Sequence, residues 1–127
     1  MPLARTLGIR TDESTAERVV LSLDWAPQLC TAGGILHGGV IMALADSAGG
    51  ACALLNLPVD ATGTTTIESK TNFLGAVRGG TVTATATPLH RGRTTVVVET
   101  TITDANGRLV AKTTQTQMVL RATASIS

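Results

Sequence analysis

Aromatic and charged residues are both scarce in this sequence. Its 127 residues include one Trp, one Phe and no Tyr, and charged residues make up 15% of the chain. A typical globular domain has about 25% charged residues, so the low value indicates a lightly charged surface or one buried against other copies of the chain. The net charge of +1 lacks the basic excess typical of nucleic-acid-binding domains. We therefore expect no nucleic-acid partner.

The sequence also has only two cysteines and few long apolar runs. Cys30 and Cys52 have neither CxxC spacing nor a histidine cluster nearby, which argues against a disulfide framework or a metal site and favours free buried thiols in a reducing compartment. Residues 1–20 lack the continuous apolar core of a signal peptide. The longest apolar run, 38–57, contains Asp46 and several glycines, so we expect a buried helix and not a membrane span. These features predict a cytoplasmic protein with no metal or other cofactor.

The order of expected elements is one strand, one long helix and four further strands. The helix runs from His37 to about Leu57, because this stretch is rich in Ala, Leu and Ile and ends at Pro58. Thr alternates with apolar residues in much of the second half, which is typical of strands. Expected strands cover 17–25, 62–74, 80–90, 93–104 and 108–120, with short turns between the last four.

These elements predict one α+β domain over residues 1–127, with 1–14 loosely ordered. Consecutive strands joined by short turns favour an antiparallel meander, with the N-terminal strand added to it. The helix is apolar around most of its circumference, so a flat sheet would leave much of it exposed. We expect a curved antiparallel sheet of about five strands wrapped around one long central helix, and a second copy covering the remainder.

Asp46 is the only charged residue between Pro27 and Val59. A carboxylate in such apolar surroundings costs several kcal/mol unless it is paired or used. His37-Gly38-Gly39 opens the expected helix, where unpaired N–H groups favour negative charge and glycines let a ligand approach closely. Asp46 lies nine residues after His37, roughly 13 Å along the axis and on the opposite face. The two features can share one site only if two chains related by a two-fold axis contribute one feature each.

Four short motifs carry a resemblance to a known family. They are GILHGG (34–39), Ala45-Asp46, NFLGA (72–76) and the turn HRGRT (90–94). With this order of elements, residues 17–120 resemble hotdog-fold proteins, and within them the PaaI-like acyl-CoA thioesterases. The resemblance implies a dimer with a continuous sheet, pairing of dimers into a tetramer, and hydrolysis of acyl-CoA without a metal at the dimer interface.

The resemblance also implies roles for particular residues. Asp46 would be general base or nucleophile, and the Gly38 N–H would polarise the thioester carbonyl. His37 and Thr66 would orient the helix start and the attacking water. Substrate-binding positions would be Thr31, Gly39, Asn72, Arg91, Gly92 and Arg93, the arginine turn lying near the CoA nucleotide. Thr31 is a departure, because many family members carry Asn or Gln there, and a hydroxyl reaches less far.

Other interpretations of these residues stay open. Asp46 could be a structural carboxylate bonded to backbone or threonines, His37 a helix cap, Thr66 a strand former, and the arginines an ordinary exposed turn. No Ser/Cys–His–Asp triad is visible, and Cys52 is expected to be a packed thiol. The chain could also bind acyl-CoA or a partner without turnover. A MaoC-type hydratase is a third possibility, although no His follows Asp46 until His90.

Overall fold

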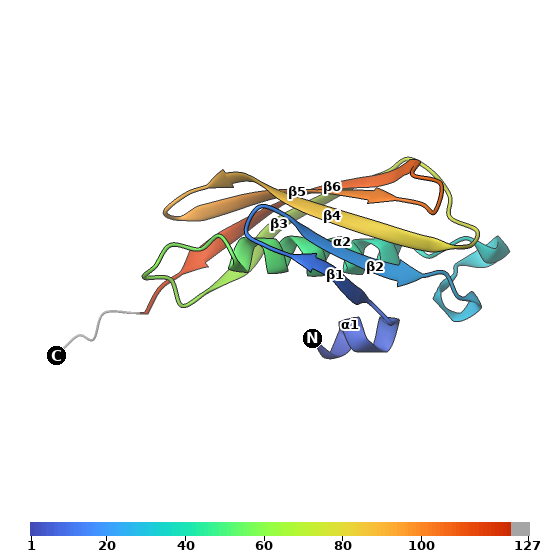
Figure 1. Cartoon of the computed structure of the whole chain (residues 1–127), viewed down its shortest axis with the longest axis horizontal. Helices are drawn as coiled ribbons and strands as arrows, with labels where there is room; N and C mark the ends of the chain where they lie inside the picture. Colours follow the sequence, from blue (N-terminus) through green and yellow to red (C-terminus); the bar gives the residue numbers. More distant parts are fainter. Residues whose placement is uncertain (123–127) are drawn as a thin grey trace.

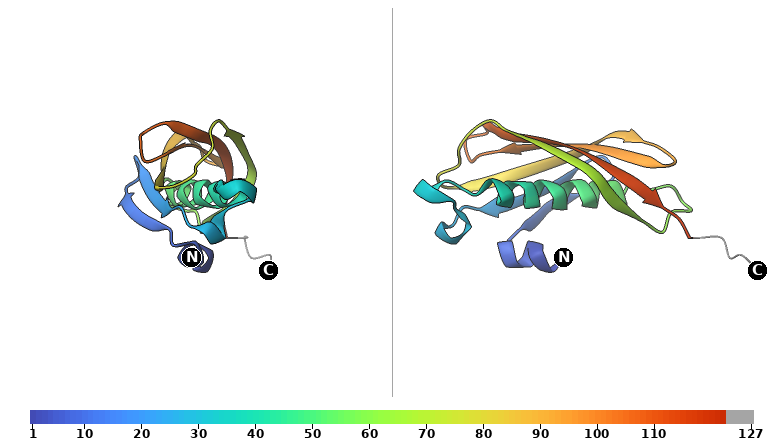
Figure 2. Two further views of the ribbon diagram at one scale, coloured as in Figure 1. Left: turned by 90° about the vertical axis from the view of Figure 1, so that its right-hand side faces the viewer. Right: turned by 180° about the vertical axis from the view of Figure 1, so that it is seen from behind.

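The computed structural model describes residues 1–122 and contains one antiparallel sheet that curves around one long helix (Figures 1 and 2). The helix is α2, Gly38–Leu54. The strands are β1 (Arg10–Ser14), β2 (Val19–Asp24), β3 (Gly63–Phe73), β4 (Thr81–Arg91), β5 (Thr95–Thr103) and β6 (Leu109–Leu120). A short helix α1, Pro2–Leu7, precedes them, and two 3-10 turns, Pro27–Leu29 and Ala32–Gly34, lead into α2. The predicted α+β hotdog architecture is confirmed, with six strands in place of about five.

The core lies between α2 and the concave face of the sheet. Leu44, Ala48 and Cys52 of the helix are fully buried there. Strand β5 shows why the sheet covers them, because its residues alternate between buried and partly exposed along its whole length. That alternation sends Val96, Val98 and Ile102 toward the helix. On the helix side away from the core, Met42 and Leu54 remain exposed, so one chain alone leaves part of the apolar helix uncovered.

The order of strands corrects the expected meander. Strands β4, β5 and β6 are joined as successive hairpins, but the sheet order is β1-β2-β4-β5-β6-β3. Strand β3 therefore pairs with β6 and not with β4, its neighbour in sequence. This places β3 at an edge of the sheet. Residues 74–80 connect β3, which lies beside β6, to β4, which lies on the other side of β5. The turn residues in the sequence do not reveal this connection across the sheet.

The N-terminus differs from the loosely ordered segment that was expected over 1–14. Ala4 of α1 is buried, and Leu7 and Ile9 pack against the core. Strand β1 pairs with β2, and Arg10 donates two hydrogen bonds to the Asp24 carboxylate, at 2.9 and 3.1 Å. The polar composition of this segment is typical of an edge strand. Its Arg10 side chain pairs with Asp24 of the neighbouring strand β2.

No helix within residues 1–122 is both long and apolar enough to span a membrane.

The pairing of β1 with β2 predicts a specific loss of stability in acid. Hydrogen bonds from Arg10 and Thr81 hold the pKa of Asp24 below its ordinary value near 3.8. Because the pKa is lower in the folded state, the stabilisation is present above the ordinary value and is lost as the pH falls through the folded pKa. We expect Asp24→Asn to reduce the fall in unfolding free energy between pH 6 and pH 3, measured by urea denaturation. Glu17→Gln, at an exposed side chain, is the control and should follow the unaltered protein; an equal change in both variants would contradict the prediction.

Candidate active site

The Asp46 side chain is exposed and faces a pocket of about 480 Å³ between α2 and β3. The helix face from Asp46 to Leu54 forms one wall, and Thr64–Thr66 of β3 with Gln117 of β6 form the other. A carboxylate at the middle of the helix is tolerated because this part of α2 remains exposed at the pocket. In the single chain Asp46 is thus not a buried structural carboxylate.

Two buried glutamines on β6 contact Asp46 or Thr66 at this pocket, and sequence reasoning missed both. Gln115 is fully buried and donates from Nε2 to Asp46 Oδ1 at 2.9 Å. Gln117, also buried, donates from Nε2 to Thr66 Oγ1 at 2.8 Å. The available signal was the alternation of β6, which puts Gln115 and Gln117 on the same inward face as Val119. Two amides on the inward face of a strand paired on both sides indicate a polar site.

The start of α2 leaves one N–H group available. The His37 Nδ1 accepts from the Gly39 N–H at 2.8 Å, and the His37 carbonyl accepts from Val40 and Ile41. His37 is therefore the helix cap, which was one of its two expected roles. Within residues 1–122, the Gly38 N–H has no hydrogen-bond acceptor. A Cβ on Gly38 would lie 3.2 Å from the Phe73 ring, so the helix start packs closely against the end of β3.

Within one chain the candidate residues fall into separate groups along α2. Thr31, His37, Gly38 and Gly39 lie at or just before the helix start, where Asn72 precedes Phe73 at the end of β3. Asp46 is eight residues after Gly38, about 12 Å along the helix axis at 1.5 Å per residue. The fold brings Asp46 to Thr66, through Gln115, but it does not bring Asp46 to the Gly38 N–H.

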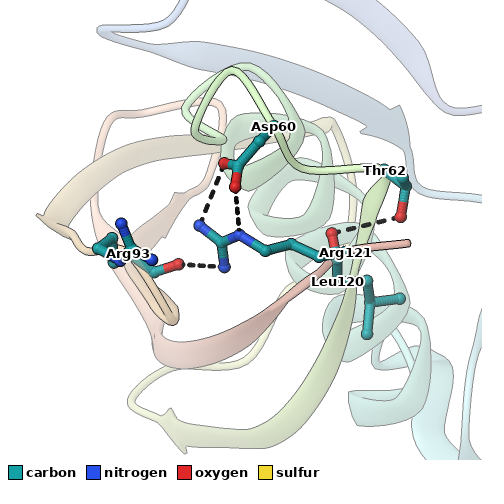
Figure 3. A network of polar contacts seen from close by, with 5 residues as sticks. All are labelled: Asp60, Thr62, Arg93, Leu120 and Arg121. Atoms are coloured by element: carbon teal, nitrogen blue, oxygen red, sulfur yellow. Dashed lines mark hydrogen bonds and ion pairs between the residues drawn. The ribbon is translucent and has the colours of Figure 1, made fainter. Parts of the chain in front are cut away.

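The arginine turn lies at the end of the fold opposite the helix start (Figure 1). Arg91 ends β4, and the Arg93 carbonyl accepts from the Arg121 Nη1 at 2.7 Å. Figure 3 shows Arg121 between that carbonyl and the Asp60 carboxylate, which it contacts at 2.8 Å. The hydrogen bond from Arg121 holds the pKa of Asp60 below its ordinary value. The side chains of Arg91 and Arg93 are exposed and donate no hydrogen bond within residues 1–122.

Nucleophiles near Asp46 are already engaged or buried. The Ser47 hydroxyl donates to the Ala43 carbonyl at 2.8 Å, as helical serines commonly do. Cys52 is fully buried, and burial raises the pKa of its thiol. In the described part of the chain, no three His, Cys, Asp or Glu side chains gather into a possible metal site.

Comparisons with known proteins agree on one family. Residues 33–111 match the family model described as thioesterase superfamily. The chain is 36% identical over 119 residues to "Putative esterase ComA2" of Bacillus subtilis, covering 94% of each protein. It is 33% identical over 110 residues to 1,4-dihydroxy-2-naphthoyl-CoA hydrolase of Listeria monocytogenes, covering 87% of this chain and 89% of that one. The solved "Structure of a putative esterase Rv1847/MT1895 from Mycobacterium tuberculosis" superposes with a TM-score of 0.92 at 31% identity, covering 97% of this chain and 99% of that one.

The environment of Cys52 predicts an unreactive thiol. Because burial raises its pKa, little thiolate forms at neutral pH and reagents cannot reach it. We expect N-ethylmaleimide at pH 7.5 to label the partly exposed Cys30 much faster than Cys52 in the native protein, and both equally in urea, as measured by peptide mass spectrometry. Equal native labelling of the two thiols would contradict this assignment.

Proposed function

The chain belongs to the thioesterase superfamily, and from that premise we propose that it hydrolyses acyl-CoA or aryl-CoA thioesters to free acid and CoA in sites shared between two subunits. The Listeria relative acts on an aryl-CoA by its name, which supports a CoA thioester as substrate. The pocket supports this too, because Gly50, Ala51 and Leu54 offer small and apolar surface to an acyl group.

In the proposed site, one chain supplies the carboxylate and the other the oxyanion donor. Asp46 activates water or attacks the thioester carbonyl directly. The N–H of Gly38 of the partner subunit polarises that carbonyl and stabilises the developing negative charge. Support comes from the availability of both groups, since the Gly38 N–H has no acceptor within residues 1–122 and Asp46 is exposed in the pocket. One straight helix keeps them too far apart to act within one chain.

The edge position of β3 is the observation that carries the proposal. An unpaired edge of eleven residues is a ready template for a second strand. Antiparallel pairing of two β3 strands about Ser69 would set Glu68 opposite Lys70 of the partner subunit, a favourable cross-strand charge pair. The same pairing brings the Phe73 end of one strand, with its Gly38, to the partner's Thr64–Thr66 wall. Each pocket would then receive the other chain's helix start.

The remaining candidate residues fit secondary roles in this proposal. Thr66 holds the attacking water, and His37 orients the helix start by capping it. Gly39 lets the substrate approach closely, and the Thr31 hydroxyl and Asn72 amide line the entrance contributed by the partner. For the nucleotide end of CoA, the turn Arg91-Gly92-Arg93 supplies two exposed guanidinium groups suited to phosphates.

We also retain three broader proposals. The subfamily is the PaaI-like one, on the motifs at residues 34–39 and 45–46. Dimers pair into tetramers, since Met118 and Leu120 expose apolar surface on the sheet face away from α2. The location is cytoplasmic, because both cysteines are free, as is usual in a reducing compartment.

Asp46→Asn is expected to keep the fold and the oligomer and to lose about 10²–10⁴-fold in kcat, the usual contribution of a catalytic acid or base. An amide fits the same space and its oxygen still accepts from Gln115. The measurement is free-thiol release from a panel of short, long and aryl acyl-CoA substrates. Unchanged turnover would remove Asp46 from the mechanism, and no thiol release by the unaltered protein would favour acyl-CoA binding without turnover.

Complementation between two inactive variants tests the shared site. Gly38→Pro deletes the N–H and adds ring carbons beside Phe73, in a backbone that accepts proline, because proline suits the first helical position and His37 already has the extended backbone that precedes proline. Gly38→Ala is the control, since it adds a Cβ against Phe73 but keeps the donor. We expect Gly38→Pro to lose about 10²–10³-fold in kcat and Gly38→Ala much less.

Mixing Gly38→Pro and Asp46→Asn subunits through a denaturation and refolding cycle should then restore activity. A statistical mixture contains heterodimers in half of its dimers, each with one intact site, so about a quarter of normal activity is expected. Activity no higher than that of the separate variants would contradict a site built from two chains.

A further inference from the structure

The two glutamines of β6 occupy positions where apolar residues are the rule. Gln115 is fully buried and Gln117 is 1% exposed, and their strand pairs with β5 on one side and β3 on the other. Burying an amide costs free energy unless its groups are hydrogen-bonded. Both amides turn their NH₂ ends toward pocket residues, so each NH₂ group has a hydrogen-bond acceptor.

The orientation of the Gln115 amide follows from its two neighbours on α2. Its Nε2 donates to Asp46 Oδ1 at 2.9 Å. Its Oε1 has no hydrogen-bond partner in the described residues and lies against Gly49, where a Cβ would come within 2.1 Å. The reverse orientation would place Oε1 against the carboxylate, which repels it. Gly49, three residues after Asp46 on the same helix face, is therefore the space that admits the amide.

Thr66 receives two hydrogen bonds from the same pair of amides. Its Oγ1 accepts from Gln117 Nε2 at 2.8 Å and from Gln115 Nε2 at 3.3 Å. The Thr64 hydroxyl lies 3.3 Å from Gln117 Oε1, and its nearer acceptor is the Met118 carbonyl at 2.9 Å. A hydroxyl has two acceptor sites and one proton. With both acceptor sites of Thr66 occupied by N–H donors, its proton is left to be donated into the pocket.

The β-bulge in β3 makes this arrangement possible. Thr66 is paired with Gln117 and Glu68 with Thr116, so Ile67 is the extra residue. A bulge redirects the side chains on either side of it. Thr66 therefore faces inward to Gln117 and the pocket, and Ile67 remains exposed.

From these contacts we propose that Gln115 and Gln117 are positioning residues that set Asp46 as a hydrogen-bond acceptor and Thr66 as a hydrogen-bond donor on one pocket wall. This inference rests on the proposed thioesterase function. A water between the two donates to the free Asp46 oxygen and accepts from the Thr66 hydroxyl, which directs its remaining lone pair toward the thioester carbon. As the new C–O bond forms, Asp46 takes the water proton. The C–S bond then breaks, and that proton passes to the CoA sulfur.

A double-mutant cycle between Thr66 and Gln117 tests the proposal. Thr66→Val removes the hydroxyl and should lower kcat about 10–100-fold with KM nearly unchanged, whereas Thr66→Ser should keep most of the activity. Gln117→Met keeps the length but frees the hydroxyl to rotate, and should lower kcat about 3–10-fold, the worth of one hydrogen bond. In the Thr66→Val background, the same Gln117→Met change should cost less than about 2-fold, because no hydroxyl remains to be positioned.

Gln115→Met should likewise lower kcat, by about 10-fold or more, because it removes a hydrogen bond to a charged group. Thr101→Val, on the outward face of β5, is the matched control and should leave kcat unchanged. Thermal unfolding of every variant checks the fold, and Gln117→Leu replaces Gln117→Met if the latter does not fold.

The possible outcomes separate this inference from the proposed function. If Gln117→Met costs the same in both backgrounds while Asp46→Asn remains nearly inactive, the glutamines only support the fold and the positioning role is wrong. If Asp46→Asn is as active as the unaltered protein, the proposed function fails at its carboxylate, and the positioning role fails with it. A Gln117→Met loss that appears only when Thr66 keeps its hydroxyl supports the inference.

Discussion

The fixed rise of the α-helix is the constraint on which the candidate site depends. Helix α2 presents an N–H without an acceptor in the described residues at Gly38 and a carboxylate eight residues later at Asp46, on a rod that cannot bend them together. The sheet wraps only the core side of this rod, so the other side, with Met42 and Leu54, stays exposed. A second copy is the simplest means of covering that side and of joining the two halves of the site.

The sheet contributes as much to the site as the helix does. Strand β6 places two amides beneath Asp46 and Thr66, and the bulge in β3 turns Thr66 toward them. The two glutamine amides are buried and have few competing partners, so the directions of their hydrogen bonds are well defined. The pocket wall therefore has a built-in polarity, an acceptor beside a donor, before any substrate enters.

Local patterns predicted most of the secondary structure, and long-range pairing explains what they missed. The alternation of Thr with apolar residues located β3 to β6 within about two residues, whereas the helix ends at Leu54, about three residues before the end at Leu57 that Pro58 had suggested. The pairing of β3 with β6 was not predicted, because the residue pattern of β3 is equally compatible with pairing to β4, its neighbour in sequence. The N-terminal strand β1 was missed because its stability comes from contacts such as Arg10 with Asp24, and composition does not record contacts.

The sequence by itself determined the fold class, the central helix and the prominence of Gly38 and Asp46, since periodicity, glycine and an isolated charge are all local properties of the chain. It also indicated that these two groups can share a site only between two chains, because the number of helical residues that separate them fixes their distance along the axis. Only the tertiary structure decided that β3 is an edge strand and that Gln115 and Gln117 hydrogen-bond to Asp46 and Thr66. Those features depend on which distant strands pair and in what register. Contacts between residues far apart in the chain decide the pairing and the register, and the local sequence around each residue does not.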